Sequence, residues 1–197
     1  MTLCHRNRVA ATIMLLCCVT LLSSACVPLL IGGAVVGGAA VATDRRSAGA
    51  QLDDEVIETK SALAITERFK GNDFHVNVTS FNGIVLITGE VPSTGAKAEV
   101  EQVVRVNPKV RAVQNELVVG PATDIGSRSN DTLITSKVKT RFVEANKFQI
   151  NYVKVVTENG VVYLMGIVRR EEGDAAAEIA RTTSGVQRVV KVFEYIP

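Results

Sequence analysis

The hydrophobic pattern of this chain contains the same strand, turn and strand signal twice. The segments "VTSFNGIVLITGEV" (78–91) and "VVTENGVVYLMGIV" (155–168) align at an offset of 77 residues, and each places Asn-Gly between two runs rich in β-branched residues. This arrangement is the strongest short-range signal of a β-hairpin. The alternation within "GIVLITG" and "GVVYLMG" predicts strands that turn one face toward helices.

Helical periodicity precedes each hairpin, and a second helix (95–106 and 171–182) and a closing strand (110–119 and 186–196) follow it. The expected buried positions of the opening helices are Val56, Leu63 and Phe69 in the first copy and Ile134, Val138, Phe142 and Ala145 in the second. The candidate N-caps are Asp53 or Asp54 and Asn130 or Asp131. Each copy therefore has the predicted order αββαβ.

The repeat extends beyond the hairpins. Asp54 and Ile57 match Asp131 and Ile134 at the same offset, so a duplication of a unit of about 70 residues accounts for the pattern. We expect an α+β fold with two tandem domains, each a small mixed sheet covered by helices on one face. The expected limits are 52–120 and 130–197, with a linker at 121–129.

The N-terminal residues 1–25 have the form of a secretory signal peptide. His5, Arg6 and Arg8 precede an apolar segment (9–22) that is too short to span a bilayer alone, and small residues follow it. Small residues directly before Cys26 resemble a bacterial lipobox, although Ser occupies position 23, where Leu is usual. The other three cysteines would leave with the leader, so Cys26 is expected to become the lipidated first residue.

Residues 26–51 are expected to form a tether, apolar and Gly-rich up to residue 42 and polar after it. The alternative is that Cys26 lies within a transmembrane helix starting near residue 9. Pro28 and four glycines interrupt that segment, and each glycine destabilises a helix by about 1 kcal/mol relative to alanine. These residues favour the tether over the span.

The repeated unit resembles the BON domain, on the basis of "FNGIVLITGEV", "ENGVVYLMGIV" and the closing "VRAVQNELVV". A lipobox followed by two such domains is similar to the DolP (YraP) family of lipoproteins of Gram-negative bacteria. The segments "TDRRSAGAQLDDE", "SNDTLITSKVKTRF" and "VKVVTENGVVYLMG" extend this resemblance over nearly the whole mature chain.

The resemblance implies a lipoprotein held at the outer membrane by acyl chains, palmitate among them, on Cys26, with its domains in the periplasm. It also implies binding of anionic phospholipid, phosphatidylglycerol or cardiolipin, through the second domain. Support of outer-membrane integrity and accumulation at division sites are further implications, and the resemblance implies that the protein has no enzymatic activity and needs no cofactor. Val27 is compatible with outer-membrane sorting, because the usual inner-membrane retention signal is Asp at that position.

The charge distribution points to the second domain as the one that meets anionic headgroups. Residues 52–120 hold 7 Lys and Arg against 10 Asp and Glu, whereas residues 124–197 hold 11 against 9. On the helix from 131 to 146, the face opposite the apolar positions carries a leucine among hydroxyl and basic side chains, which suits shallow insertion beside headgroups. The candidate phospholipid-binding residues are Leu133, Ser136, Lys137, Lys139, Thr140 and Arg141. The alternative is an ordinary solvated helix face with one exposed leucine.

Other chemistry finds little support in the sequence. His75 is the only histidine after the leader, so a metal site or a Ser-His pair lacks its partners. A mature chain with 20 basic and 20 acidic residues and few aromatics argues against a nucleic-acid surface. A second function class stays open: a periplasmic protein-interaction module that docks to the outer-membrane assembly machinery.

Overall fold

The computed structural model describes residues 44–69 and 74–197, which belong to one compact unit. The predicted signal peptide, Cys26, Val27 and the tether up to residue 43 lie outside the described residues.

Each copy of the repeat folds in the predicted order αββαβ. The first consists of α3 (Ala48–Arg68), β1 (His75–Phe81), β2 (Ile84–Val91), α4 (Thr94–Arg105), β3 (Ala112–Asn115) and β4 (Val118–Val119). The second consists of α5 (Ile125–Ala145), the short 3₁₀ helix η1 (Ile150–Tyr152), β5 (Val153–Glu158), β6 (Val161–Val168), α6 (Arg170–Arg181) and β7 (Arg188–Tyr195). The closing strand of the first copy is divided into β3 and β4.

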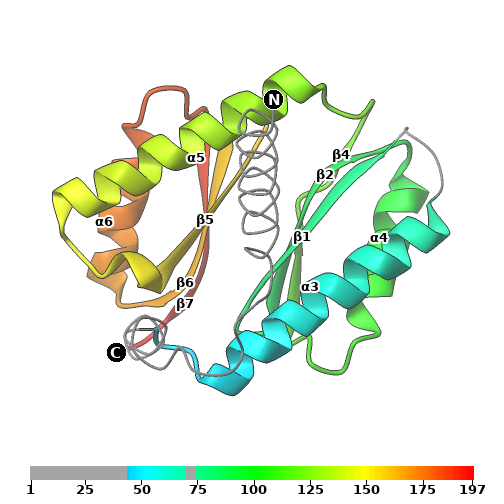
Figure 1. The fold of residues 1–197 in the computed structure, drawn as a ribbon, viewed down its shortest axis with the longest axis horizontal. Helices are drawn as coiled ribbons and strands as arrows, with labels where there is room; N and C mark the ends of the chain where they lie inside the picture. Colours follow the sequence, from blue (N-terminus) through cyan, green and yellow to red (C-terminus); the bar gives the residue numbers. More distant parts are fainter. Residues whose placement is uncertain (1–43, 70–73) are drawn as a thin grey trace, which may run out of the picture. The chain divides into compact units, whose positions relative to one another are not determined.

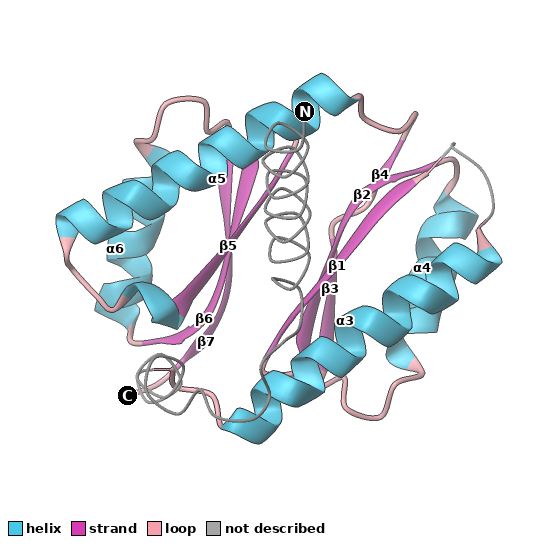
Figure 2. Cartoon of the chain, in the orientation of Figure 1, coloured by secondary structure: helices cyan, strands magenta, loops and turns pink. Residues whose placement is uncertain are grey.

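Both sheets are mixed, which confirms the predicted α+β class. In the first sheet β2 pairs antiparallel with β1 and parallel with β3 and β4; in the second, β6 pairs antiparallel with β5 and parallel with β7. Figure 1 shows both helices of each domain on the same side of their sheet, and Figure 2 shows the magenta strands of each domain on the inner side of its helices. The parallel pairing follows from the helix that crosses over between the last two strands.

The central strands β2 and β6 are buried on both faces. Val85 and Ile87 of β2 pack under the helices, as do Val162 and Leu164 of β6. The opposite faces of the two sheets meet in a third apolar cluster that contains Phe81, Leu86, Tyr163, Met165 and Ile167. The sequence predicted one covered face for these strands, and docking of the second domain covers the other.

The two Asn-Gly hairpins are confirmed by the backbone. Asn82 and Gly83 have φ angles of 53° and 74°, and the equivalent residues of the second turn have 50° and 71°. Positive φ at both central positions defines the type I′ turn, whose twist matches that of the flanking strands. Asn and Gly adopt this conformation at lower cost than other residues, so the local sequence determines the turn.

The predicted N-caps are wrong, because both opening helices begin earlier. Ser47 caps α3 by accepting a hydrogen bond from the N–H of Ala50, and Asp124 caps α5 by accepting one from the N–H of Ser127. As a result α5 starts inside the segment expected to be linker, and α3 starts inside the expected tether. Asp54 and Asp131, two of the predicted caps, lie in the helix interiors and are buried.

The predicted buried face of α3 is also wrong in part. Val56 and Leu63 are 43% and 60% exposed, and only Phe69 of the predicted set packs against the core. The buried face is formed instead by Asp54, Ile57, Ser61 and Ile65. Because α3 carries apolar side chains on two opposite faces and polar ones on the buried face, periodicity alone selects the wrong side.

Candidate functional site

A buried aspartate in α5 anchors that helix to the second hairpin turn. Asp131 is 5% exposed, and its carboxylate accepts hydrogen bonds from the N–H groups of Asn159 and Gly160, both at 2.8 Å. Asp54 makes the equivalent contacts with the first turn, at 2.7 and 2.8 Å. These contacts set the rotation of each helix about its axis, so the face opposite the aspartate turns outward. In the sequence, the only sign of this role is that Asp54 and Asp131 occupy equivalent positions of the repeat.

The outward face of α5 contains most of the candidate lipid-binding residues. Leu133 is 60% exposed, and Ser136, Lys137 and Thr140 are exposed beside it; we call these four residues the outer stripe. The opposite face buries Ile134, Val138 and Phe142, as predicted, while Ala145 is half-buried. Lys137 forms no ion pair with any residue of the described ranges, so its charge is available to an anionic partner.

The two basic residues that flank the outer stripe lie in different surroundings. Arg141 is half-buried, and its guanidinium donates to the carbonyl of Ile179 and the hydroxyl of Thr183, both at 2.8 Å. It therefore ties α5 to the end of α6. Lys139 is exposed on the other flank, toward the first domain, and lines two adjacent pockets there. The structure thus brings Lys139 to the outer stripe and engages Arg141 elsewhere.

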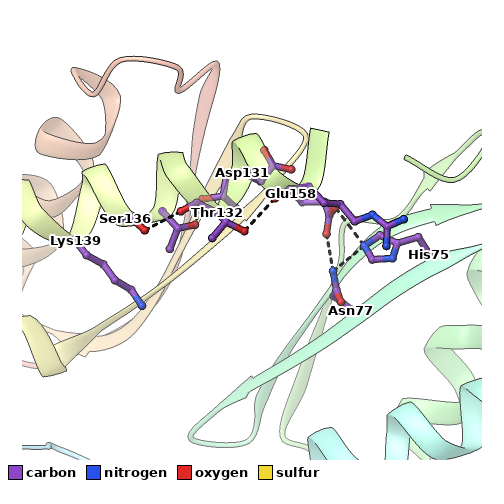
Figure 3. Close-up of a pocket in the computed structure, with 10 residues that line it drawn as sticks. His75, Asn77, Asp131, Thr132, Ser136, Lys139 and Glu158 are labelled. Atoms are coloured by element: carbon purple, nitrogen blue, oxygen red, sulfur yellow. Dashed lines mark hydrogen bonds and ion pairs between the residues drawn. The ribbon is translucent and has the colours of Figure 1, made fainter. Parts of the chain in front are cut away.

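The first of these pockets lies between α5 and the edge strand β1 and has a volume of about 490 Å³. In Figure 3, Asp131, Thr132, Ser136 and Lys139 follow one another along α5. His75, Asn77 and Glu158 lie on the side of the pocket facing the first domain. Arg128 adds a second exposed cation to its lining.

Polar contacts between the domains satisfy the carboxylate of this pocket. Glu158 is 6% exposed and accepts hydrogen bonds from the amide of Asn77 at 2.9 Å and the hydroxyl of Thr88 at 3.2 Å. The Nε2 atom of His75 lies 3.6 Å from the other oxygen of this carboxylate. His75, the only histidine after the predicted leader, therefore lies in the contact between the domains.

The hairpin asparagines also contribute to the contact between the domains. The side-chain amide of Asn159 donates to Glu90, and that of Asn82 donates to Glu194 at 3.0 Å. Burial by itself raises the pKa of Glu90, but its hydrogen bonds from Thr123 and Asn159 outweigh this effect, and the pKa lies below its ordinary value. Each turn residue therefore serves both the local hairpin and domain docking.

Two consecutive arginines before α3 connect the domains, and the sequence interpretation missed them. The guanidinium of Arg45 donates to both carboxylate oxygens of Glu172, at 2.6 and 2.8 Å, and to the carbonyl of Ile167 at 2.9 Å. It also stacks on the ring of Tyr152, 3.7 Å from its centroid. The hydrogen bond from Arg45 lowers the pKa of Glu172. Both arginines lie in a segment interpreted as polar tether, and no local pattern indicates that the partners of Arg45 lie more than 100 residues away.

Arg46 contacts the first domain instead. It pairs with Asp44 and Asp54, and its guanidinium lies 4.0 Å from the centroid of the Phe81 ring. The segment that precedes α3 is therefore attached to both domains through adjacent side chains.

The duplication provides a direct comparison between the outer faces of α3 and α5. Three positions of these faces carry similar residues in both helices: Val56 and Leu133, Lys60 and Lys137, Glu67 and Glu144. Three cations are present only in α5, where Arg128, Lys139 and Arg141 replace Gln51, Ala62 and Ala64. The second domain therefore differs from the first by added positive charge around a matched apolar position.

The described residues offer little for metal or catalytic chemistry. Within 44–69 and 74–197, no three His, Cys, Asp or Glu side chains are grouped so that they could hold a metal ion. In the pocket of Figure 3, the hydroxyl of Thr135 donates to Thr157 at 2.7 Å, while His75 contacts Asn77 and Glu158. No helix in the part of the chain that the structure describes is long and apolar enough to cross a membrane.

Comparison with known proteins identifies the domain family and several similar proteins. The BON domain matches residues 53–121 and 130–197. The chain is 38% identical to "Outer membrane lipoprotein DolP" of Haemophilus influenzae over 158 residues, which are 79% of this chain and 81% of the relative. It is 35% identical to "21 kDa hemolysin" of Actinobacillus pleuropneumoniae, over 78% of this chain and 79% of the relative. It is 27% identical to "Osmotically-inducible protein Y" of Escherichia coli, over 76% of each chain.

Proposed function

The chain belongs to the BON-domain family, as an outer-membrane lipoprotein with two copies of the domain, and we propose that it binds anionic phospholipid through α5 of the second. In this proposal, acyl chains on Cys26 hold the protein at the membrane after removal of residues 1–25, and the domains face the periplasm. The outer stripe and Lys139 contact phosphatidylglycerol or cardiolipin. This binding supports outer-membrane integrity, including at division sites, and requires no catalytic step or cofactor.

One observation supports the proposal most directly: an exposed leucine on α5 is accompanied by lysines that have no ion pair. Leu133 is 60% exposed, and both Lys137 and Lys139 are exposed without an acidic partner in the described ranges. Interfacial helices combine an apolar side chain that enters the headgroup region with cations that meet the phosphates. Some other cations of the second domain already form ion pairs; Lys154, for example, pairs with Glu58 at 2.8 Å.

The expected affinity of this surface alone is low. Two lysines near an anionic surface contribute about 1 kcal/mol each, and partial burial of one leucine contributes about 1 to 2 kcal/mol. The sum of about 3 to 4 kcal/mol corresponds to a dissociation constant in the millimolar range. A surface of this strength binds vesicles weakly by itself, at millimolar lipid, and is largely occupied only when the protein is already at the membrane.

The proposed anchor would provide that proximity. Only 17 residues lie between Cys26 and Asp44, the first described residue, so the 18 residue-to-residue steps reach at most about 65 Å. Tethering of this kind gives an effective concentration in the millimolar range, which matches the affinity of the surface. Anchor and surface are therefore expected to act together.

Vesicle co-sedimentation of fragment 40–197, which lacks the anchor but contains the whole compact unit, tests the lipid surface. We expect binding to phosphatidylglycerol vesicles that weakens with salt, because surface charges are screened over about 10 Å at 0.1 M ionic strength. Leu133→Glu and Lys137→Glu should each reduce binding about fivefold to tenfold. Val56→Glu and Lys60→Glu, at the equivalent positions of α3, are the matched controls and should bind as the wild type does.

Three outcomes would contradict the proposal or its selectivity for anionic lipid. The first is wild-type fragment that fails to bind phosphatidylglycerol vesicles at any salt concentration. The second is an equal loss of binding in the α3 and α5 variants, which would show that α5 has no particular role. Equal binding to phosphatidylcholine vesicles would refute selectivity for anionic lipid.

The anchor is tested separately by metabolic labelling with palmitate and by the intact mass of the mature protein. We expect the wild type to be labelled and the Cys26→Ala variant to be unlabelled and to retain its leader. Label in the variant would place the acyl chain elsewhere and refute attachment at Cys26.

A second function, docking to the outer-membrane assembly machinery, is favoured by the outer face of α3. Leu52, Val56 and Leu63 lie along one side of that helix and are 64%, 43% and 60% exposed. Such a row of apolar side chains is typical of helix surfaces that contact another protein. Site-specific photocrosslinking from position 63 in cells distinguishes the two roles, since it should capture a protein partner that the equivalent position on α5, residue 140, does not.

A further inference from the structure

The second pocket lined by Lys139 combines features of an anion-binding site. It has a volume of about 420 Å³ and lies between the segment before α3, the start of α3, the end of β1 and the second domain. Its polar lining includes Asp44, Arg46, Gln51, Lys139 and Lys154. We call it the arm pocket, because Asp44 and Arg46 of the segment before α3 form part of its wall.

The charges of the arm pocket favour an anion. Three basic side chains, from three separate parts of the chain, face a single carboxylate in the lining. Arg46 and Lys154 are paired with carboxylates, whereas Lys139 has no acidic partner in the described ranges. Phe81 and Val153, 4% and 5% exposed, supply an apolar wall. Charge interactions are stronger beside such a wall than in bulk water.

An unsatisfied donor is the second, independent observation. The Nε2 atom of Gln51 is buried and makes no hydrogen bond, and no other buried side-chain nitrogen or oxygen of the described residues lacks a partner. A buried amide without an acceptor is destabilising, so proteins rarely retain one without a partner such as water or a ligand. Gln51 lines the same pocket as Lys139, and a rotation of its side-chain amide toward the pocket would let one oxygen-rich anion serve both groups.

We propose that the arm pocket binds a phosphate ester, held by Lys139, Lys154 and the amide of Gln51. Phosphate offers several acceptor oxygens to donors that come from different directions, and lysine binds it as a point charge. The inference rests on the proposed function, because Lys139 links this pocket to the outer stripe and a lipid headgroup is one source of the ester. Free phosphate is the other source with the same chemistry.

The position of the pocket suits a headgroup from the membrane that anchors the protein. Asp44 lines it, and the chain that leads back to Cys26 continues directly from that residue. A lipid of the anchoring leaflet therefore lies within reach of the pocket whenever the acylated chain is in the membrane. A volume of about 420 Å³ is at the lower end of the range for small-molecule sites, which suits a headgroup.

Nuclear magnetic resonance titration of fragment 40–197 tests this inference. The probes are glycerophosphoglycerol, which is the phosphatidylglycerol headgroup without its acyl chains, inorganic phosphate, and glycerophosphocholine. We expect the side-chain amide protons of Gln51 to shift downfield as glycerophosphoglycerol binds. Lys139→Gln should weaken this binding about fivefold to tenfold, whereas Lys60→Gln, at the position of α3 equivalent to Lys137 and outside the pocket, should leave it unchanged.

Gln51→Met provides a second variant that separates ligand binding from structure. It should weaken binding of the headgroup, yet raise the midpoint of thermal unfolding of the free fragment by about 2 to 4 °C, because it removes a buried donor without a partner. A merely structural Gln51 would instead lose stability on substitution.

The outcomes distinguish the sources and the two proposals. Shifts with glycerophosphoglycerol alone identify a lipid headgroup site, and equal shifts with inorganic phosphate identify a site for free phosphate. Absence of any shift at Gln51 would overturn the inference, even if phosphatidylglycerol vesicles still bind α5. Titration of the pocket in a fragment that binds no vesicles would leave the pocket in place and refute the proposed function.

Discussion

Replacement of Asp54 by alanine removes a carboxylate that connects α3 to the first hairpin and to the segment before it. Oδ1 accepts hydrogen bonds from the hydroxyl of Ser80 at 2.6 Å and the N–H of Gly83 at 2.8 Å. Oδ2 accepts from the N–H of Asn82 at 2.7 Å and from Arg46 at 3.0 Å. Both oxygens of the carboxylate therefore accept hydrogen bonds within the protein, and Asp54 is only 2% exposed.

The cost follows from the donors that the substitution leaves behind. Each buried donor without an acceptor costs about 1 to 3 kcal/mol, and at least the two backbone N–H groups lose theirs. Arg46 keeps its pair with Asp44, so its loss is smaller. We expect Asp54→Ala to lower the free energy of unfolding by about 3 to 5 kcal/mol, within the range for breaking a buried pair. That is a large part of the 5 to 15 kcal/mol typical of a domain.

Urea unfolding of fragment 40–197, followed by circular dichroism at pH 7, measures this loss. Asp53→Ala is the control, because the side chain of the adjacent Asp53 is 45% exposed and makes only a surface ion pair with Lys109 at 3.0 Å. Its expected effect is about 0 to 1 kcal/mol. If Asp54→Ala cost no more than the control, the aspartate would not be what holds the hairpin to the helix.

Three further predictions follow from contacts elsewhere in the unit. Arg45→Ala removes the paired hydrogen bonds to Glu172 and should destabilise the fragment by about 1 to 3 kcal/mol. It should also make the segment before α3 more accessible to trypsin. An unchanged cleavage rate would contradict the attachment of this segment to the second domain. Gly166→Ala should lower the free energy of unfolding in urea by about 3 kcal/mol or more. A Cβ atom there would lie 2.1 Å from the carbonyl oxygen of Tyr152 and would force β5 and β6 apart. A decrease below about 1 kcal/mol would refute that close contact. Because the folded-state pKa of Glu90 lies below its ordinary value of 4.5, its stabilisation is complete above that value and is lost as the pH falls through the folded-state pKa. Glu90→Gln should therefore flatten the decline in unfolding midpoint below about pH 4.5, and identical pH profiles would disprove the contribution.

Most of the secondary structure was predictable because its signals are local. The Asn-Gly turns require positive φ at two consecutive residues, which few other sequences adopt at low cost. Glycine also recurs at positions 89 and 166, within the second strand of each hairpin, where a Cβ atom would lie 2.0 Å from the carbonyl oxygen of His75 and 2.1 Å from that of Tyr152. Each of these signals occurs in both copies of the repeat, so each copy supports the prediction for the other.

The rotation of α3 was not predictable in the same way. Its apolar residues lie on two faces, and the true core face contains Asp54 and Ser61. The hydrogen bonds that make burial of Asp54 favourable come from a turn 28 and 29 residues away. On α5 the same problem did not arise, because Ile134, Val138 and Phe142 form a single apolar face.

Some residues of the candidate site were likewise predictable from the sequence, and others were not. The outer stripe of α5 follows from that single face, so Leu133 and Lys137 were placed correctly on the exposed side. Arg141 was expected beside the stripe, but the end of α6 supplies acceptors that hold it. The arm pocket depends on Gln51, Lys139 and Lys154, which lie far apart in the chain and share no spacing that a sequence pattern detects.

By itself the sequence determined the duplicated αββαβ unit, the two hairpin turns and the exposed face of α5, since each depends on residues within one helix or one turn of each other. The tertiary structure decided which face of α3 is buried, where Arg45 and Arg46 bind, and that the free faces of the two sheets pack together. Those features depend on the partner that each polar or apolar group meets when distant segments come together. Burial of a charged group is favourable only when that partner is present, and no neighbouring residue in the chain indicates it.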